Sequence, residues 1–570
     1  MGGLSSVGEP LQKALKRLGF FIHSEREFPS TIKGGKASNT FNISTQPVRS
    51  LSQKIDIAIG LDREGVKDAL ETLSNGGILI HAFDRWNKVI KDLPAQEEAK
   101  NLRVVLIPAR EIAVENGGSL IMVNTVLLGY LWKVLGFEIE ILKTEIAEQF
   151  SSKPGLINLN LKCLEAGYNY DSGESLPALN IAKPVEILKT ILIDGNTSLA
   201  LGAIQAGVRA YYAYPMSPST SILVYLAKVS HKTEMLVKQA EDEITAVQMA
   251  LGSMHMGTRS LVFTSGGGFD LMTETISLSG MIEVPLVVGI VQRPGPATGL
   301  PTWTSQADLN LAIYSGHGEF SRIVIAVSDP TSCYLEIQNA FNLAEKYQTP
   351  VIILSEATIA MSYETVGVFE DNLIPVVRNL VKPENLESLQ NSDRYKITEN
   401  GISQRWLPGQ SKTTFFANGD EHWEGGELTE EADKSEQMIA KRLRKTETII
   451  AELPEPEIYG MEKTKLAIIG WGSTKNVILD AIEILKDQNI EVNYLHYTYL
   501  WPLKTDKFLK FIETNPNFFI IEGNHGGQLA DLLQKETNLN PQEIDQRKLN
   551  KWNGRPFFVE EIIEFVKTKI

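Results

Sequence analysis

Glu243 stands just before residues 244–254, whose small and apolar side chains predict a buried helix. A carboxyl group in such a place can share a proton with a ring nitrogen of a bound heterocycle and so activate it. A structural interpretation competes, because Glu241, Asp242 and Glu243 together would also stabilise the positive end of the helix dipole. Taken alone, the acidic run favours the structural interpretation.

Arg293 follows the apolar run 285–291, which predicts a strand, so its guanidinium is expected at the carboxyl end of that strand. Ligands of open α/β sheets bind at that edge, and a guanidinium matches a carboxylate through two parallel hydrogen bonds. Residues 294–302 then form a loop stiffened by prolines, and this loop ends at Thr302. A surface arginine at a strand end is the alternative interpretation.

A second proline-rich loop, residues 214–220, reads Tyr-Pro-Met-Ser-Pro-Ser-Thr and also follows a predicted strand. Tyr214 and Pro215 open this loop, and Ser217 presents a hydroxyl close to the start of the next helix, where anions are favoured. The alternative is a rigid turn in which a serine caps the helix.

A glycine-rich loop follows the predicted strand 260–264. It contains Thr264, Ser265, Gly266 and Gly267, and its glycines permit a ligand to approach the backbone closely. It is not a phosphate-binding P-loop, because no lysine follows in the required place.

These loops need a rigid scaffold, and the alternation of apolar strands with helices predicts an α/β fold built from parallel sheets. We expect three doubly wound α/β domains, over residues 1–182, 190–382 and 459–570, with a linker over 383–458. The predicted strands are 54–60, 77–81, 104–108, 209–214, 260–264, 286–291, 321–326, 350–355, 465–470, 491–495 and 518–522.

The linker carries a charged helix, predicted over residues 427–453. Its basic run, residues 441–445, is interpreted as a solvated helix face, with a docking surface as the alternative.

Composition narrows the class of protein. The net charge of −15 argues against nucleic acid as the main partner. No apolar run reaches about 18 residues, so no transmembrane helix is expected, and the N-terminus lacks the features of a secretory signal. With two cysteines, a disulfide framework is excluded and a cytoplasmic location fits. The eight histidines are dispersed without metal-ligand spacing, so no metal site is predicted on this chain.

The two cysteines also limit redox chemistry, because a cubane iron–sulfur cluster needs about four cysteine ligands. If the reaction is a redox reaction, the electrons must leave through another subunit.

Four stretches, 214–220, 241–246, 264–269 and 292–302, occur in an order that resembles the α subunit of 2-oxoacid:ferredoxin oxidoreductases, which are thiamine diphosphate enzymes. The resemblance implies that Glu243, three residues before Ala246, activates the cofactor, with Glu241 as the second choice.

The same resemblance implies that Arg293, Thr302 and Ser217 orient the substrate carboxylate. Tyr214, Pro215 and residues 264–267 would line the pyrimidine side of the cofactor. The family pattern is Tyr-Pro-Ile-Thr-Pro, so this chain departs from it at Met216 and Ser217, which loosens the inference about the substrate.

Residues 1–182 resemble the γ domain of the same enzymes, which can be fused ahead of the α subunit. The matching stretches are 26–30, 33–35 and 56–62. That domain normally begins with a strand and then a glycine-rich loop, and Gly2 and Gly3 are expected to lie already in the loop. Either translation starts earlier, or the domain tolerates an open position there. The resemblance places Lys33 near the path of coenzyme A, and a solvated lysine is the alternative. Residues 459–570 resemble a transketolase C-terminal domain.

We find no Gly-Asp-Gly motif followed by paired asparagines, the pattern that holds magnesium and diphosphate in thiamine enzymes. In the family this half of the site, with the iron–sulfur cluster, belongs to the β subunit. The expected function is therefore oxidative decarboxylation of a 2-oxoacid, preferably 2-oxoglutarate, to acyl-CoA and CO2, with electrons passed to ferredoxin. Pyruvate, branched-chain oxoacids or indolepyruvate are alternative substrates, and a non-catalytic assembly subunit is an alternative of another class.

Overall fold

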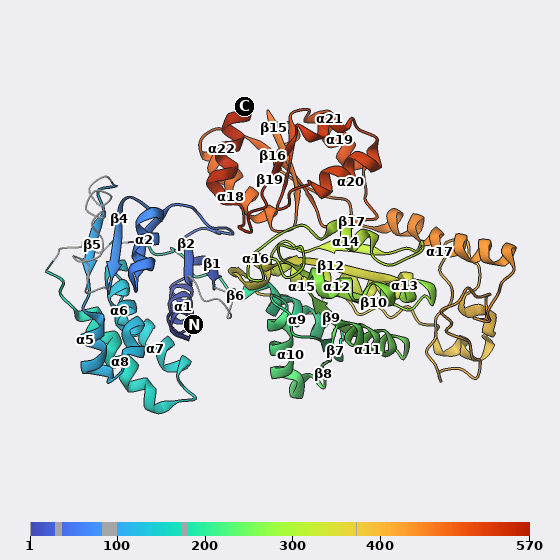
Figure 1. Ribbon diagram of the computed structural model, residues 1–570, viewed down its shortest axis with the longest axis horizontal. Helices are drawn as coiled ribbons and strands as arrows, with labels where there is room; N and C mark the ends of the chain where they lie inside the picture. The colour runs from blue at the N-terminus through green and yellow to red at the C-terminus, as the bar shows by residue number, and fades with distance from the viewer. Residues whose placement is uncertain (1, 29–36, 83–99, 174–178, 180, 372) are drawn as a thin grey trace. The chain divides into compact units, whose positions relative to one another are not determined.

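The computed structural model describes residues 2–28, 37–82, 100–173, 179, 181–371 and 373–570, and these form two compact units. Unit 1 comprises residues up to Leu192 together with Tyr363–Thr365 and Phe558–Glu560, and unit 2 comprises the rest. Figure 1 shows both units as mixtures of helices and strands. The predicted α/β class is confirmed, whereas the predicted domain boundaries stay predictions.

Unit 1 contains two sheets. Strands β3 (Ile55–Gly60), β4 (Leu73–His81) and β5 (Arg103–Leu106) are parallel, as the sequence predicts. The other sheet was not predicted and has the order β2-β1-β13-β6, in which β1 (Phe21–Glu27) pairs antiparallel with β2 (Ser38–Ser44) and with β13 (Tyr363–Gly367). The stretch that contains Lys33 lies outside the described residues.

The helices of unit 1 include one that is buried along most of its length. This helix, α6 (Val123–Leu135), lies against α8 (Pro154–Asn169), and Gly129 and Gly167 allow close contact, because a Cβ on either would meet backbone of the other helix. The remaining helices are α1 (Gly2–Arg17), α2 (Arg63–Thr72), α5 (Ala109–Gly117), η1 (Leu120–Met122) and α7 (Ile139–Gln149).

Unit 2 is built on a seven-stranded sheet in the order β17-β11-β12-β10-β9-β7-β8, parallel except for β17 (Tyr499–Trp501). Its central strands β10 and β12 are buried at every position, as strands covered on both faces require, whereas the edge strand β8 is largely exposed. The parallel strands are β7 (Ala210–Ala213), β8 (Leu236–Gln239), β9 (Ser260–Thr264), β10 (Leu286–Gln292), β11 (Ile323–Ala326) and β12 (Pro350–Glu356). β6 (Thr190–Asp194) precedes them.

Helices cover this sheet on both faces (Figure 1). α9 (Gly195–Gln205) packs with α15 (Pro330–Tyr347), and α11 (Glu243–His255) packs with α13 (Thr273–Met281). The others are α10 (Thr220–Thr233), α12 (Gly266–Asp270), α14 (Leu309–Tyr314) and α16 (Ala357–Met361).

A second sheet of unit 2 has the order β14-β16-β15-β18-β19, with β14 (Glu457–Tyr459) antiparallel to β16. Its parallel strands are β15 (Leu466–Trp471), β16 (Val492–Tyr497), β18 (Phe518–Glu522) and β19 (Lys548–Asn550). Its helices are α18 (Thr474–Asp487), α19 (Asp506–Thr514), α20 (Gln528–Thr537), α21 (Pro541–Asp545) and α22 (Val559–Lys569). Both sheets of unit 2 share one hydrophobic core.

In the sequence between β13 and β14, the chain forms η2 (Pro383–Ser388), η3 (Asn391–Arg394) and α17 (Ala432–Glu452). Here the interpretation of the basic run as a solvated face is wrong, and its side chains do not form an exposed docking surface either. Lys441 and Lys445 are buried and both form ion pairs with Glu283, each with an N–O distance of 2.5 Å.

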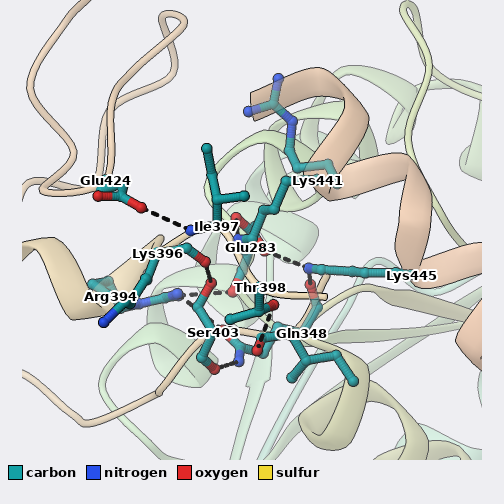
Figure 2. A network of polar contacts seen from close by, with 12 residues as sticks. Glu283, Gln348, Arg394, Lys396, Ile397, Thr398, Ser403, Glu424, Lys441 and Lys445 are labelled. Atoms are coloured by element: carbon teal, nitrogen blue, oxygen red, sulfur yellow. Dashed lines mark hydrogen bonds and ion pairs between the residues drawn. The ribbon is translucent and has the colours of Figure 1, made fainter. Parts of the chain in front are cut away.

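Figure 2 shows this network, which we call the Glu283 cluster. Arg394 Nη2 donates to the carbonyl oxygen of Glu283 (2.8 Å), and Arg394 Nη1 donates to the side chain of Gln348 (2.9 Å). Glu283 is a residue of the turn before β10, about 160 positions from α17, so no local pattern could reveal that these lysines have a buried carboxylate partner.

Candidate functional site

The strand order of the seven-stranded sheet reverses at one point. β7 has β8 on one side and β9 on the other, so the direction in which the chain adds strands reverses between β7 and β9. In open α/β sheets, ligands bind outside the carboxyl ends of the strands at such a reversal. The proline-rich loop after β7 and the glycine-rich loop after β9 both begin there.

Glu243 is the first residue of α11 and its side chain is buried, with 3% of the residue exposed. The capping role belongs to its neighbour: Asp242 Oδ1 accepts the backbone N–H of Thr245 (2.7 Å), and this bond lowers the pKa of Asp242. Glu241 is exposed. Because Asp242 caps the helix, the carboxyl of Glu243 is left to face inward, where Thr264 Oγ1 donates to its Oε1 (3.4 Å).

The glycine-rich loop fits closely around this carboxyl. A Cβ on Gly268 would collide with both Thr264 Oγ1 and the carboxyl of Glu243, so only glycine allows the loop to lie there. Gly267, by contrast, is exposed, and a Cβ there would find its nearest neighbour, the carbonyl oxygen of Ala297, 4.0 Å away. The loop therefore leaves space at Gly267 and none at Gly268.

Met216 connects the proline-rich loop with the glycine-rich loop. Its Sδ accepts a hydrogen bond from Ser265 Oγ (2.6 Å) and lies 3.7 Å from Thr264 Oγ1. Because the Thr264 hydroxyl carries one hydrogen, donation to Glu243 excludes donation to Met216. The departure from the family's isoleucine thus supplies a sulfur acceptor at the base of the site.

Arg293 follows β10 and reaches back to the proline-rich loop. Its Nη1 donates to the backbone carbonyl of Ser217 (2.7 Å). Burial lowers the pKa of Arg293, and the charge of Asp308 opposes that shift. Ser217 itself is exposed and, in the structure, offers Arg293 its carbonyl rather than its hydroxyl. Asn196 Nδ2 holds the same loop from α9 by donating to the carbonyl of Pro218 (2.9 Å).

The loop after Arg293 closes on itself. The N–H of Leu300 donates to the carbonyl of Pro294 (3.0 Å), and Gly299 has a φ of +52°, a conformation that favours glycine.

The N–H of Thr304 donates to the carbonyl of Gly554 (3.1 Å), and the Arg555 guanidinium lies over the Trp303 ring. Thr302 lies between these two anchor points, partly buried. Tyr214 and Pro215 open the neighbouring loop, and Tyr214 is 40% exposed.

Gln306 and Glu356 anchor the far end of this loop, and sequence reasoning gave neither a role. Gln306 Nε2 donates to Glu356 Oε1 (2.8 Å) and to the carbonyl of Trp471 (2.8 Å), and the N–H of Ser473 also donates to Glu356 (2.8 Å). Burial raises the pKa of Glu356 to about 7 against these hydrogen bonds. Trp471 and Ser473 belong to β15 of the second sheet and the loop that follows it, so only the fold brings them to Gln306 and Glu356.

Asp308 was also missed. It begins α14, but its side chain does not cap that helix. Instead its carboxyl lies against Gly266, where an added Cβ would be 2.9 and 3.0 Å from the two oxygens. The sequence signal that could have indicated Asp308 is its position, only six residues after Thr302, a predicted substrate contact.

Within the described residues, no group of three or more His, Cys, Asp or Glu side chains is arranged to hold a metal ion. Nor does any described helix combine the length and apolar character that a membrane span requires.

The fold and the site together define a class: an α/β chain with a buried carboxylate and a guanidinium at the reversal point of an open sheet. A family model described as "Pyruvate flavodoxin/ferredoxin oxidoreductase, thiamine diP-bdg" matches residues 201–441, and one described as "Pyruvate ferredoxin/flavodoxin oxidoreductase" matches residues 2–170.

The 2-oxoacid:ferredoxin oxidoreductase subunit alpha of a Sulfolobus species is 33% identical, over 99% of this chain and 94% of the relative. The 2-oxoglutarate oxidoreductase subunit KorA of Mycobacterium tuberculosis is 28% identical, over 100% of this chain and 90% of the relative. The chain belongs to the family of 2-oxoacid:ferredoxin oxidoreductase α subunits.

A solved structure gives the same result. The 2-oxoglutarate:ferredoxin oxidoreductase of Magnetococcus marinus, described with 2-oxoglutarate, coenzyme A and succinyl-CoA bound, matches with a TM-score of 0.90 at 29% identity, over 99% of this chain and 97% of that chain. The resemblance inferred from the sequence is confirmed, and with it the enzyme class, an oxidoreductase.

Proposed function

We propose that this chain, together with a partner subunit, oxidatively decarboxylates a 2-oxoacid, with 2-oxoglutarate as the favoured substrate. The acid and coenzyme A give acyl-CoA and CO2, and two electrons pass to ferredoxin. One observation carries the proposal: buried Glu243, at the start of α11, contacts the loop after β9, and partly buried Arg293 contacts the loop after β7. Both loops begin at the reversal point between β7 and β9. The names of the M. tuberculosis and M. marinus relatives favour 2-oxoglutarate.

The residues present fit the pyrimidine half of thiamine diphosphate. Two observations support this fit: an added Cβ would find space at Gly267, and the neighbouring Gly268 lets the loop lie directly against the Glu243 carboxyl. When bound, the cofactor supplies the nucleophilic carbon and the electron sink that decarboxylation needs. Glu243 would hold the proton shared with the ring nitrogen, and Tyr214, Pro215 and residues 264–267 would line the ring.

Arg293 would bind the substrate carboxylate, since its guanidinium is already oriented by the Ser217 carbonyl and still has donors to offer. Thr302 and the hydroxyl of Ser217 would complete that contact. The closed loop from Pro294 to Thr304 would hold these groups in place and exclude water from one side of the site.

A partner subunit would supply the rest. We propose that a β-type subunit carries the diphosphate and magnesium site and the iron–sulfur cluster, because both cysteines of this chain are buried, one in each unit. Exposed apolar side chains adjoin the site in the sequence on three of its loops and on α11, as expected of a surface that a partner covers. They are Tyr214, Ile244, Leu271 and Leu300.

The test of this function is the E243Q variant of the complete complex. Gln preserves the size of the side chain but cannot share a proton in the same way, so we expect turnover to fall by about 10²–10⁴-fold. Binding of the partner subunit should be unchanged, which gel filtration measures. Full turnover in E243Q would refute the role of Glu243.

Substrate preference needs a separate experiment. Competition between 2-oxoglutarate, pyruvate, branched-chain oxoacids and indolepyruvate, with ferredoxin reduction as the readout, should give the highest kcat/KM for 2-oxoglutarate. A preference for pyruvate would contradict the proposed substrate and leave the reaction class intact. A non-catalytic assembly role is disfavoured because both Glu243 and Arg293 are present and contact the two loops at the reversal point.

A further inference from the structure

Asp308 is a buried acid that the proposed function leaves unused. It stands at the N-cap position of α14, where an aspartate ordinarily accepts backbone N–H groups of its own helix, yet its side chain makes no such bond. Its backbone N–H donates to Gln292 Oε1 (3.0 Å), which fixes the backbone. Its carboxyl lies against Gly266 of the glycine-rich loop, and its Oδ2 is buried without a hydrogen-bond partner among the described residues.

A buried polar atom without a partner is costly unless something that binds there satisfies it. The charged groups that face Asp308 are Arg293, beyond β10, and Asp270, at the end of α12. The remainder of α14 carries no charged side chain, and Lys535 of α20 is engaged with the hydroxyl of Tyr314 (3.2 Å) at the far end of that helix. Asp308 therefore lies against the glycine-rich loop and within electrostatic reach of Arg293, where the substrate carboxylate is proposed to bind.

We propose, on the basis of the proposed function, that Asp308 is a further substrate-binding residue. Its carboxyl takes up a proton as an anionic 2-oxoacid binds beside Arg293, and then donates that hydrogen to the acid in a hydrogen bond. Proton uptake follows from charge. A second carboxylate close to Asp308 disfavours the ionised form, whereas the neutral form turns an acceptor that would repel the ligand into a donor. No bond other than the O–H bond changes, and the proton comes from solvent.

The resting state of Asp308 suits this exchange. Burial raises its pKa to about 6, helped by Asp270 and opposed by Arg293. At pH 7 the free site is thus mostly ionised, and binding of an anion raises the pKa further. Uptake should approach one proton per site between pH 6.5 and 7.5 and vanish near pH 5, where Asp308 is already protonated.

The experiment is calorimetric titration of the complete complex with 2-hydroxyglutarate, which carries the carboxylates of 2-oxoglutarate and has no keto carbon to react. Titrations at pH 7 in two buffers of different ionisation enthalpy count the protons taken up. The wild-type complex should take up close to one proton. D308N, a neutral donor of the same shape, should bind within about threefold of wild type with no uptake from this site. D308L should bind about tenfold more weakly or worse.

Two controls separate the possible failures. D270N removes the exposed neighbouring acid and should keep the proton uptake. Equal uptake in D308N and wild type would overturn the inference while leaving the proposed function standing. Absence of binding to the wild-type complex would contradict the proposed substrate class and this inference with it.

Discussion

The packing around Glu243 depends on two adjacent glycines that behave differently. Gly268 leaves no room for a Cβ between Thr264 and the Glu243 carboxyl, whereas Gly267 faces open space. The sequence identified the loop and its glycines but could not rank them, because the distinction depends on a carboxylate 25 residues earlier in the chain.

G268A should therefore displace Glu243 or the loop and lower kcat/KM by about 10²-fold, since small displacements of catalytic groups have effects of that size. G252A is the control, because Gly252 is an exposed residue of α11 where an added Cβ meets nothing within 4 Å, and this variant should retain more than half of the wild-type kcat/KM. Steady-state kinetics of the two complexes provides the measurement. Wild-type kcat/KM in G268A would contradict the close fit of this loop around Glu243.

At the residue scale the sequence predicted much of the site because strand ends and loop residues are local features. Glu243, Arg293 and the loops at 214–220 and 264–268 follow from such features. Asp308 and Gln306 do not, because their roles depend on contacts with a distant loop and with the second sheet of unit 2.

The central strands and helices of unit 2 could be predicted from apolar runs, while β1 and β2 could not. Their residues are mixed in polarity, and β1 gains its second neighbour from β13, more than 300 positions later. The prediction that the basic run on α17 is a solvated face was wrong for a related reason. Charged residues usually lie on the surface, and these lysines are buried because they pair with one buried carboxylate, that of Glu283.

The Glu283 cluster fixes α17 to the strand scaffold, so removing its carboxylate should cost stability. E283Q leaves Lys441 and Lys445 buried without a counter-ion, and we expect a loss of about 3–5 kcal/mol. E447Q, on the exposed side of the same helix, is the control and should change stability by less than about 0.5 kcal/mol. Urea denaturation monitored by tryptophan fluorescence compares them. Equal stability of E283Q and wild type would contradict a structural role for the cluster.

Glu356 should make stability depend on pH. Burial raises its pKa from the ordinary value of 4.5 to about 7 in the folded protein, so the folded state binds more protons between these values. Stability contributed by this group therefore falls as pH rises from 4.5 to 7, by roughly 3 kcal/mol in total. Because glutamine does not titrate, the thermal midpoint of E356Q should rise relative to that of the wild type as the pH increases from 4.5 to 7. Parallel curves for the two proteins would show that Glu356 stays ionised.

At the scale of the whole molecule, we propose that the chain supplies one half of a site. Its fold brings a carboxylate, a guanidinium and a glycine-rich loop to the carboxyl-terminal edge of one sheet, and its family membership assigns it to a multi-subunit oxidoreductase. We predict that the pyrimidine-binding half of the cofactor site lies on this chain. The diphosphate and magnesium site and the iron–sulfur cluster are predicted to lie on the partner subunit.

Reconstitution tests this division most directly. The chain is purified alone and together with the partner that accompanies it from its native source. Iron content and 2-oxoglutarate-dependent, coenzyme A-dependent reduction of ferredoxin are then measured for both samples. We predict neither iron nor activity in the isolated chain, and both in the complex. Activity of the isolated chain, or a complex whose activity survives E243Q, would contradict the account.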